Sequence, residues 1–209
     1  MERSNALDSA TANTEATVEG EGRRVIYFST VRDKTYGVFS NMAPAVFHVN
    51  GKKYRTVEHF YHSEKFRLAA EATGNETTKK SLLDLATKIQ VGSREDGLVG
   101  GLQAKEFVRE HEKELPHGFL KEKWEGQLAV DVMRKGLRAK FTEDREWNWE
   151  LLWRLLATGD AYLVQKSEVC RQWGWHPSSG GGNALGRLLM ELRDEGQRLL
   201  ERERQMNRC

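Results

Sequence analysis

Apolar positions along the chain fall into two patterns, short β-rich runs and longer stretches at helical spacing. The short runs predict strands, and the clearest signal among them is the dipeptide Asn50-Gly51. An Asn-Gly pair favours a hairpin, because a type I′ turn requires positive φ at both central residues. The predicted strands are therefore the run at 25–28, the two hairpin arms at 46–49 and 52–55, and a short run at 161–164.

Helical spacing of leucine and other apolar residues dominates the rest of the chain. Thr56 is a suitable N-cap for a helix running to about Ala70, and Asn183 is a suitable N-cap for the last helix. The predicted helices cover 56–70, 75–90, 101–114, 119–141, 146–157 and the stretch from 183 onward. A few short strands among these helices predict an α+β fold, a single and mostly helical domain.

The first 22 residues differ in composition from the rest of the chain. They hold five acidic residues, one basic residue and almost nothing bulky, so they cannot bury enough apolar surface to order themselves. We expect a disordered acidic tail over 1–22, one domain over 23–204 and a short C-terminal tail over 205–209. Residues 23–190 carry a net charge of +6 within a total of +2, which suits a phosphate-bearing ligand.

Composition also excludes several classes of protein. The 209 residues contain no apolar run near the roughly 20 residues of a membrane helix, so no membrane partner is expected. The two cysteines, Cys170 and Cys209, are far apart in sequence, which does not suggest a disulfide framework. No secretory signal is recognisable at the N-terminus. We expect a cytoplasmic protein, with the nucleus as the alternative.

The predicted helix after the hairpin carries the residues best suited to catalysis. Glu58 and Lys65 are seven positions apart, so they share a face at about 10 Å along the axis. That is too far for an ion pair, but a ligand can lie between them, near Tyr61 and His62; a solvated charged face is the alternative. His59 and His62 have a spacing that suits a metal, but no third ligand follows, so no metal or cofactor is expected.

A loop ahead of the hairpin carries a second group of candidates. It contains Tyr36, Phe39, Ser40 and Asn41, and such a set can stack on a base or hydrogen-bond a sugar. The alternative is an ordinary turn whose aromatic residues anchor it to the core.

Two loops further along the chain, each next to a predicted helix, carry groups that could take part in catalysis or in binding. Asp160 stands between a predicted helix and a predicted strand, where it can serve acid–base catalysis or simply form a turn. A glycine-rich stretch that includes Gly182 precedes Asn183 and the last helix. Backbone N–H groups at such a helix start can cradle a phosphate, although a glycine-rich loop can equally be a linker.

Taken together, these segments resemble the NADAR family, also called YbiA-like. The match runs in order over about residues 24–200 and leaves out both tails. The matching pieces are Tyr36-Gly37-x-Phe39-Ser40-Asn41-x-x-Pro44, the hairpin, Thr56-x-Glu58-His59-x-x-x-x-x-Lys65-Phe66, Trp124-Glu125, Val132-Met133, Leu137-Arg138-Ala139-Lys140-Phe141, Leu155-Leu156-Ala157-Thr158-Gly159-Asp160, Trp173-Gly174 and Asn183-x-Leu185-Gly186-x-x-Leu189-Met190-x-x-Arg193.

The resemblance implies a cytosolic N-glycosidase of mixed α/β type. Some members of the family are similar to hydrolases of early riboflavin-pathway ribosylamino-pyrimidines, and others to enzymes that remove ADP-ribose from the exocyclic amine of guanine. By the same resemblance, Glu58 and Lys65 would be the catalytic pair. The ligand site would be lined by Ser40, Asn41, Trp124, Trp173, Gly174 and Asn183.

The chain departs from the family pattern in two regions. The stretch 91–119 and the loop after Trp173-Gly174 are longer than in the bacterial pattern. Many members have Glu and Asp at the positions where this chain has Gln165 and Cys170. The loss of two carboxylates from one loop disfavours the riboflavin-type substrate.

Both substrate classes join ribose C1 to an exocyclic nitrogen, and such a group can leave with help from a carboxylate. It can also ring-open to an imine that a neutral lysine captures as a Schiff base. Our hypothesis is that Lys65 is the nucleophile and Glu58 shuttles protons, in removal of ADP-ribose from guanine of DNA or RNA. The alternatives are hydrolysis of a riboflavin intermediate and a non-catalytic module that binds ADP-ribose or NAD.

Overall fold

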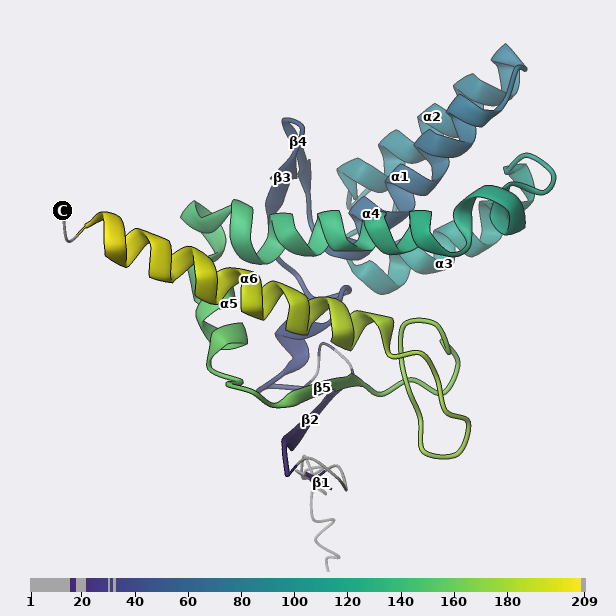
Figure 1. Ribbon diagram of the computed structural model, residues 1–209. Helices are drawn as coiled ribbons and strands as arrows, with labels where there is room; N and C mark the ends of the chain where they lie inside the picture. The colour runs from purple at the N-terminus through teal and green to yellow at the C-terminus, as the bar shows by residue number, and fades with distance from the viewer. Residues whose placement is uncertain (1–15, 18–21, 30, 32, 208–209) are drawn as a thin grey trace, which may run out of the picture.

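The computed structural model describes residues 16–17, 22–29, 31 and 33–207 (Figure 1). Its strands are β1 (Ala16–Thr17), β2 (Arg24–Phe28), β3 (Phe47–Val49), β4 (Lys52–Tyr54) and β5 (Tyr162–Gln165). Its α-helices are α1 (Val57–Ala72), α2 (Glu76–Val91), α3 (Gly101–His111), α4 (Gln127–Arg138), α5 (Arg145–Leu156) and α6 (Ala184–Met206). Shorter helical turns are η1 (Gly37–Phe39), η2 (Glu112–Glu114) and the π-helical η3 (Leu120–Trp124) and η4 (Ala139–Glu143). The prediction of a single, mostly helical α+β domain is confirmed.

β2 is the central strand of a three-stranded sheet. It runs parallel to β5, with Val25 opposite Tyr162 and Phe28 opposite Gln165. A parallel pair requires a crossover, and the helices α1 to α5 lie between these two strands in sequence. Because both strands end at the same edge of the sheet, the loops that follow Phe28 and Gln165 leave the sheet together.

The third strand, β1, lies within the segment that composition predicts as a disordered tail. Ala16 and Thr17 pair antiparallel with Val25 and Arg24 of β2, so at these two positions the chain is paired rather than disordered. The backbone hydrogen bonds of a sheet edge do not need bulky side chains, which is why composition does not reveal this strand. Residues 1–15 and 18–21 lie outside the described residues, and for them the tail remains a prediction.

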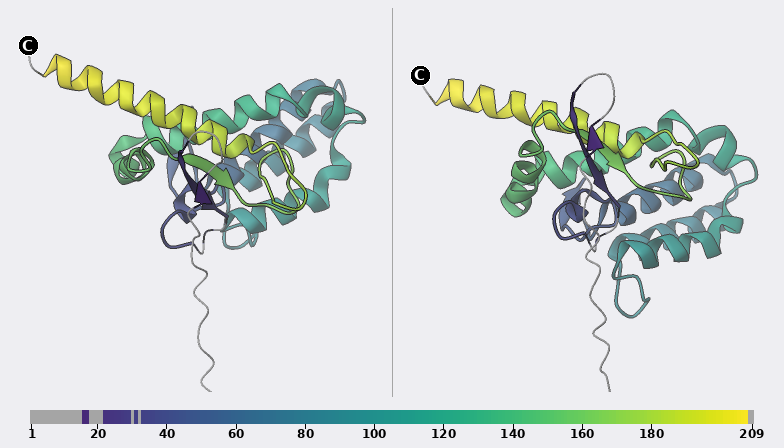
Figure 2. Two further views of the ribbon diagram at one scale, coloured as in Figure 1. Left: turned by 60° about the horizontal axis from the view of Figure 1, so that its bottom comes forward. Right: turned by 90° about the horizontal axis from the view of Figure 1, so that it is seen from below.

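The core lies between the inner face of the sheet and the helices. Ile26, Phe28 and Leu163 point into it from the sheet, and Leu185 and Leu188 of α6 pack on the same cluster. α1 packs against α2, α3 and α4, and Figures 1 and 2 show α6 beside β5, with its C-terminal end extending past the other helices. Among the described residues, no helix is long and apolar enough to cross a bilayer.

The local signals for the hairpin and for α1 are confirmed. Asn50 has φ of 52° and Gly51 has φ of 73°, as a type I′ turn requires, and the turn joins β3 to β4. Thr56 caps α1, because its side chain accepts a hydrogen bond from the backbone N–H of His59 at 3.2 Å. These two signals place the first turn of α1 directly after the hairpin.

Two predicted element boundaries are wrong. The single helix predicted over 119–141 is divided into η3, α4 and η4, because Gly126 has φ of 98° and a right-handed helix cannot continue through that conformation. At the other end of the chain, α6 continues to Met206, so the first two residues of the predicted C-terminal tail are helical.

Candidate active site

The first turn of α1 is tied to the loop that precedes the hairpin. The backbone N–H of Glu58 donates to the carbonyl of Asn41 at 3.0 Å. The side chain of Asn41 also donates to Glu58, through a very short contact between Nδ2 and Oε2. The loop and the helix therefore hold Ser40, Asn41 and Glu58 together, and all three are buried.

Glu58 is a buried carboxylate with two side-chain partners. It is 4% exposed, and its Oε1 lies 3.1 Å from Nε2 of His62, one helical turn further along α1. Since a carboxylate accepts, His62 donates from Nε2. Its other ring nitrogen, Nδ1, is buried and has no hydrogen-bond partner among the described residues. An unpartnered nitrogen beside a buried carboxylate is available to a ligand.

Lys65 is buried on the same helix and forms an ion pair that its sequence spacing did not predict. Its Nζ lies 2.8 Å from Oε1 of Glu112, which belongs to η2 in the long stretch 91–119. Only 4% of the Lys65 side chain is exposed, against 42% for Glu112. The carboxylate of Glu112 therefore stands between the buried amine of Lys65 and the solvent.

Three aromatic side chains pack beside this acid–base group. The indole N–H of Trp124 donates to the hydroxyl of Tyr61 at 3.1 Å, and the ring of Trp173 meets Tyr61 edge-on at 5.7 Å between centroids. Burial raises the pKa of the Tyr61 phenol, so Tyr61 stays protonated, and its hydroxyl oxygen accepts the hydrogen bond from Trp124. Tyr61 therefore joins Trp124 and Trp173 to α1.

The glycine-rich stretch holds the loop of Trp173 rather than presenting a free phosphate cradle. The backbone N–H groups of residues 182–185 donate to the carbonyls of residues 171–174, so the start of α6 is already occupied. A Cβ at Gly181 would lie 2.2 Å from the carbonyl oxygen of Gly174, which explains the glycine. The sequence left open whether this stretch is a phosphate cradle or a plain linker. Neither describes the observed hydrogen bonding between the stretch and residues 171–174.

Asn183 stands before α6 but does not cap it with its side chain. Its Oδ1 accepts from the backbone N–H of Gln165 at 3.0 Å, and its Nδ2 donates to the carbonyl of Leu163 at 2.8 Å. The side chain thus bonds β5 to the start of α6. Gly174 is also confined, because a Cβ there would lie 2.5 Å from the side chain of Ser167.

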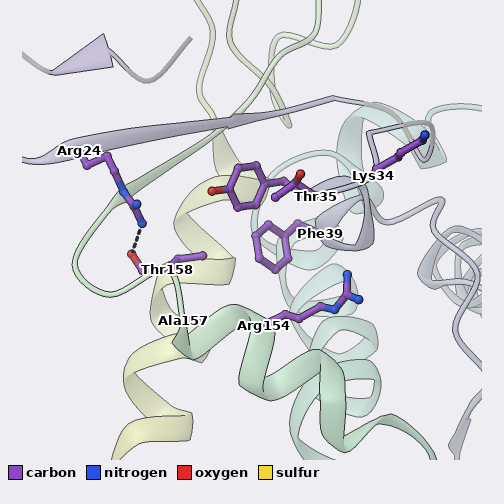
Figure 3. Close-up of a pocket in the computed structure, with 8 residues that line it drawn as sticks. Arg24, Lys34, Thr35, Phe39, Arg154, Ala157 and Thr158 are labelled. Carbon is purple, nitrogen blue, oxygen red and sulfur yellow. Dashed lines mark hydrogen bonds between the residues drawn. The ribbon is translucent and has the colours of Figure 1, made fainter. Parts of the chain in front are cut away.

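The structure places Tyr36 and Phe39 away from Glu58. Their stacked rings line a cavity of about 450 Å³ that also borders Arg24, Arg154 and Thr158 (Figure 3). Figure 3 shows Arg24 reaching the carbonyl of Thr158, a hydrogen bond of 3.4 Å. The loop therefore turns one end toward this cavity and the other end, with Asn41, toward α1.

Asp160 also lies apart from the cluster around Glu58. It is exposed in the turn before β5, whereas the loop with Trp173 follows the other end of that strand. Its charge acts on Arg193, whose guanidinium donates to the carbonyl of Ala161 at 2.8 Å. This position suits a turn that anchors α6.

His59 is engaged at both ring nitrogens. Its Nδ1 lies 2.8 Å from the hydroxyl of Thr56 and its Nε2 lies 2.7 Å from the carbonyl of Leu98. Burial lowers its pKa, so the ring is a neutral part of the core. Within the described part of the chain, no group of three His, Cys, Asp or Glu side chains gathers as a metal site requires.

Lys140 is a functional candidate that the sequence did not single out. It is completely buried on η4, and its Nζ donates to the carbonyls of Val38 at 2.6 Å and Ser40 at 3.0 Å. Burial lowers the pKa of Lys140 to about 7. The amine therefore fixes the backbone of the loop that brings Asn41 to Glu58. A lysine within an apolar stretch, next to Phe141, was the available signal.

The chain is similar to known proteins in sequence and in fold. The family model described as NADAR domain matches residues 27–196. The N-glycosidase YbiA of Escherichia coli is 34% identical over 169 residues, which cover 81% of this chain and 86% of that protein. The NMR structure of E. coli YbiA is similar, with a TM-score of 0.58 and 32% identity over 85% of this chain and 86% of that one. The riboflavin biosynthesis protein VVA0006 of Vibrio vulnificus is 30% identical over 79% of this chain but only 37% of its own length.

Proposed function

This chain belongs to the NADAR family, and on that premise we propose that it is an N-glycosidase that removes ADP-ribose from the exocyclic amine of guanine in DNA or RNA. Its relatives in E. coli and Nostoc punctiforme are named N-glycosidases, which supports the general activity. The observation that carries the proposal is the pair of buried ionisable groups, Glu58 and Lys65, on one helix beside three aromatic side chains. Charged groups are seldom buried this deeply unless they are paired, and buried ionisable groups are frequent at functional sites.

The reaction begins with opening of the ribose ring. In its protonated form, Glu58 gives a proton to the ring oxygen as the bond between that oxygen and C1 breaks, which leaves C1 doubly bonded to the guanine nitrogen. Lys65 passes a proton to Glu112, and its free amine then adds to C1. Glu112 is the nearest acceptor, since it already holds the Lys65 ammonium.

The second half of the reaction releases both products. Glu58 moves a proton from the Lys65 nitrogen to the guanine nitrogen, and guanine leaves as the free amine while Lys65 stays bonded to C1 as a Schiff base. Water then adds to C1, and the bond between C1 and Lys65 breaks to release ADP-ribose. A proton released from the water passes to Glu58 and the proton held by Glu112 returns to Lys65, so the protein is restored.

Two features of the site favour a diphosphate substrate over a monophosphate intermediate of the riboflavin pathway. Cys170 lies near Tyr61, so a cysteine borders the cluster where many family members have a carboxylate. Gln165 is uncharged, and its buried Oε1 has no hydrogen-bond partner among the described residues. Fewer negative charges repel a diphosphate less.

The riboflavin alternative has support of its own, because relatives in Vibrio vulnificus and Zea mays are named riboflavin biosynthesis proteins. The chain spans only 37% and 23% of those two proteins. Turnover of ADP-ribosylated guanosine and of a ribosylamino-pyrimidine phosphate should be measured side by side. We expect faster hydrolysis of the guanosine adduct; faster hydrolysis of the pyrimidine would overturn the proposed substrate.

Borohydride trapping during turnover tests the covalent step. We expect mass spectrometry to find a reduced adduct on Lys65 in the native protein. Lys65→Arg should be inactive, because a guanidinium stays protonated and cannot attack C1, although it can keep the ion pair with Glu112. Glu58→Gln should bind ADP-ribose and turn over slowly, since the amide keeps the shape and loses proton transfer. Near-full activity of Lys65→Arg would show that Lys65 supplies only a positive charge.

A further inference from the structure

The outer face of the sheet holds a cavity that the reaction described above does not use. Val25 and Tyr27 are two positions apart on β2, so their side chains point to the same face of the strand. The same holds for Tyr162 and Val164 on β5. The register places Val25 opposite Tyr162 and Tyr27 opposite Val164, so all four side chains share the face turned away from the core. Together with the loop before α6, they line a cavity of about 350 Å³.

The walls of this cavity are aromatic and positively charged. Trp175 lies nearly parallel to Tyr27, with ring centroids 6.4 Å apart and 29° between the planes. Lys166 stands over the Tyr27 ring, with its Nζ 4.6 Å from the centroid. Arg187, on the first turn of α6, closes the cavity and hydrogen-bonds to the carbonyl of Gly182. None of the described residues that line the cavity is acidic.

We propose that this cavity binds a nucleotide, with the base against Tyr27, Tyr162 and Trp175 and a phosphate toward Arg187. Aromatic side chains stack on any base, and an arginine beside them attracts phosphate, so the combination is typical of nucleotide recognition. Val25 and Val164 supply the apolar floor that a planar ring requires. The volume admits a base with its sugar.

The cavity adjoins the proposed catalytic centre through one short segment. Trp173 contacts Tyr61 in that centre, and Trp175, two residues later, contacts Tyr27 in the cavity. The backbone N–H of Trp175 donates to the carbonyl of Gln165 at 2.8 Å, which holds this segment against the end of β5. The segment 173–175 therefore contacts both the proposed catalytic centre and the cavity.

The role of the cavity in catalysis rests on the proposed function. Two parts of the proposed substrate carry a base and a phosphate that the cavity could bind. One is the adenosine end of ADP-ribose, and the other is a nucleotide next to the modified guanine in a strand. Both present a flat base and a phosphate. Their contributions are separated by comparing AMP, ADP-ribose and a short unmodified single-stranded oligonucleotide as probes.

Isothermal titration with these three probes tests the cavity without any turnover. Trp175→Ala should weaken the binding of at least one probe by about tenfold or more, because a base stacked on an aromatic ring loses most of its contact area. Trp175→Phe, which keeps a ring, should retain most of the affinity. The matched control is Trp149→Ala, which removes a tryptophan that is 61% exposed on α5, outside the cavity.

Charge is tested separately on α6. Arg187→Gln should weaken binding and reduce its dependence on salt, because one phosphate contact is lost. Arg198→Gln, an exposed arginine of the same helix that does not line the cavity, is the control. Tyr162→Leu repeats the stacking test if Trp175→Ala does not fold.

The outcomes distinguish the proposals. Weaker binding of AMP and ADP-ribose assigns the cavity to the adenosine end, and weaker binding of the oligonucleotide alone assigns it to the strand. Unchanged binding of all three probes in folded Trp175→Ala or Tyr162→Leu overturns the cavity as a nucleotide site. The variants could lose binding while the native protein fails to release ADP-ribose from guanosine. In that case the proposed function is wrong, but the assignment of the cavity as a nucleotide site is supported.

Discussion

At the scale of single residues, the ion pair between Lys65 and Glu112 changes how Lys65 must be understood. Glu58 bonds His62 on α1, whereas the partner of Lys65 comes from η2, 47 residues further along the chain. Because Glu112 is 42% exposed while Lys65 is buried, substitution of Glu112 removes less packing than substitution of Lys65. The function of the pair can therefore be tested from the Glu112 side without loss of the fold.

Glu112→Gln should lower kcat about tenfold or more, because an amide cannot accept the Lys65 proton. The free energy of unfolding should fall by no more than about 3 kcal/mol, since the amide oxygen can still accept a hydrogen bond from the buried Lys65. Glu114→Gln is the matched control, because its carboxylate lies on the same turn and bonds Ser81 instead, at 3.2 Å. An unchanged kcat in Glu112→Gln would mean that Glu112 only covers Lys65.

Lys140 gives a prediction about pH and stability. Its pKa is lowered to about 7 in the folded protein from an ordinary 10.5, so between these pH values the unfolded chain holds a proton that the folded chain has lost. The free energy of unfolding should therefore rise with pH over this window. The neutral amine still has two N–H donors for the carbonyls of Val38 and Ser40.

Urea unfolding of the native protein and of Lys140→Met, compared at pH 7 and pH 9, measures the contribution of Lys140 to the pH dependence of the free energy of unfolding. The variant lacks the titrating group, so its stability should rise less between the two pH values. Other titrations are shared by both proteins and cancel in the difference. Equal pH dependence in the two proteins would contradict the lowered pKa of Lys140.

At the scale of elements, the start of α6 and the loop that precedes it are one structural unit. Four backbone N–H groups of 182–185 donate to four carbonyls of 171–174, and this brings Trp173 to α1. The glycines have an architectural role, because backbone must approach backbone closely there.

Gly181→Ala should disrupt this unit. Its Cβ would lie 2.2 Å from the carbonyl oxygen of Gly174, so the loop must move and Trp173 with it. We expect a lower melting temperature together with a lower kcat. Gly180→Ala is the control, because it also has positive φ, 65°, but meets no atom within 4 Å, so only its local strain of about 1–2 kcal/mol is expected. Equal loss of activity in both variants would contradict the role of the close approach.

At the scale of the whole molecule, the parallel pair β2–β5 sets where the chemistry lies. The loops after both strands lead to the cluster around Glu58, while β1 pairs with β2 at its other end, at Arg24 and Val25. β1 and the candidate active site are therefore at different ends of the sheet.

Two truncations test this separation. Removal of residues 1–15 should leave the melting temperature and the activity nearly unchanged, as composition predicts for a tail. Removal of residues 1–22 also removes β1, and we expect the melting temperature to fall by a few degrees, at about 1 kcal/mol for each backbone hydrogen bond lost. Activity should persist in both. A loss of activity on removal of 1–22 would show that the segment reaches the active site.

The features that the sequence predicted well depend on neighbours in the chain. Some signals act over only a few residues, so they can be recognised in the sequence without knowledge of the fold. They are the turn at Asn50-Gly51, the cap at Thr56 and the helical spacing of apolar residues. The ordered motifs likewise predicted the family. The predicted helix over 119–141 failed because a single glycine, Gly126, adopts positive φ.

The tertiary structure alone decided which partners the buried polar and charged side chains have. Glu112 meets Lys65, Lys140 meets the carbonyl of Ser40, and Asn183 bonds β5, each across a separation in sequence that no periodicity spans. Such contacts depend on how helices and strands pack. A pattern of apolar residues determines which face of an element is buried, but it does not determine which polar group will be buried opposite it.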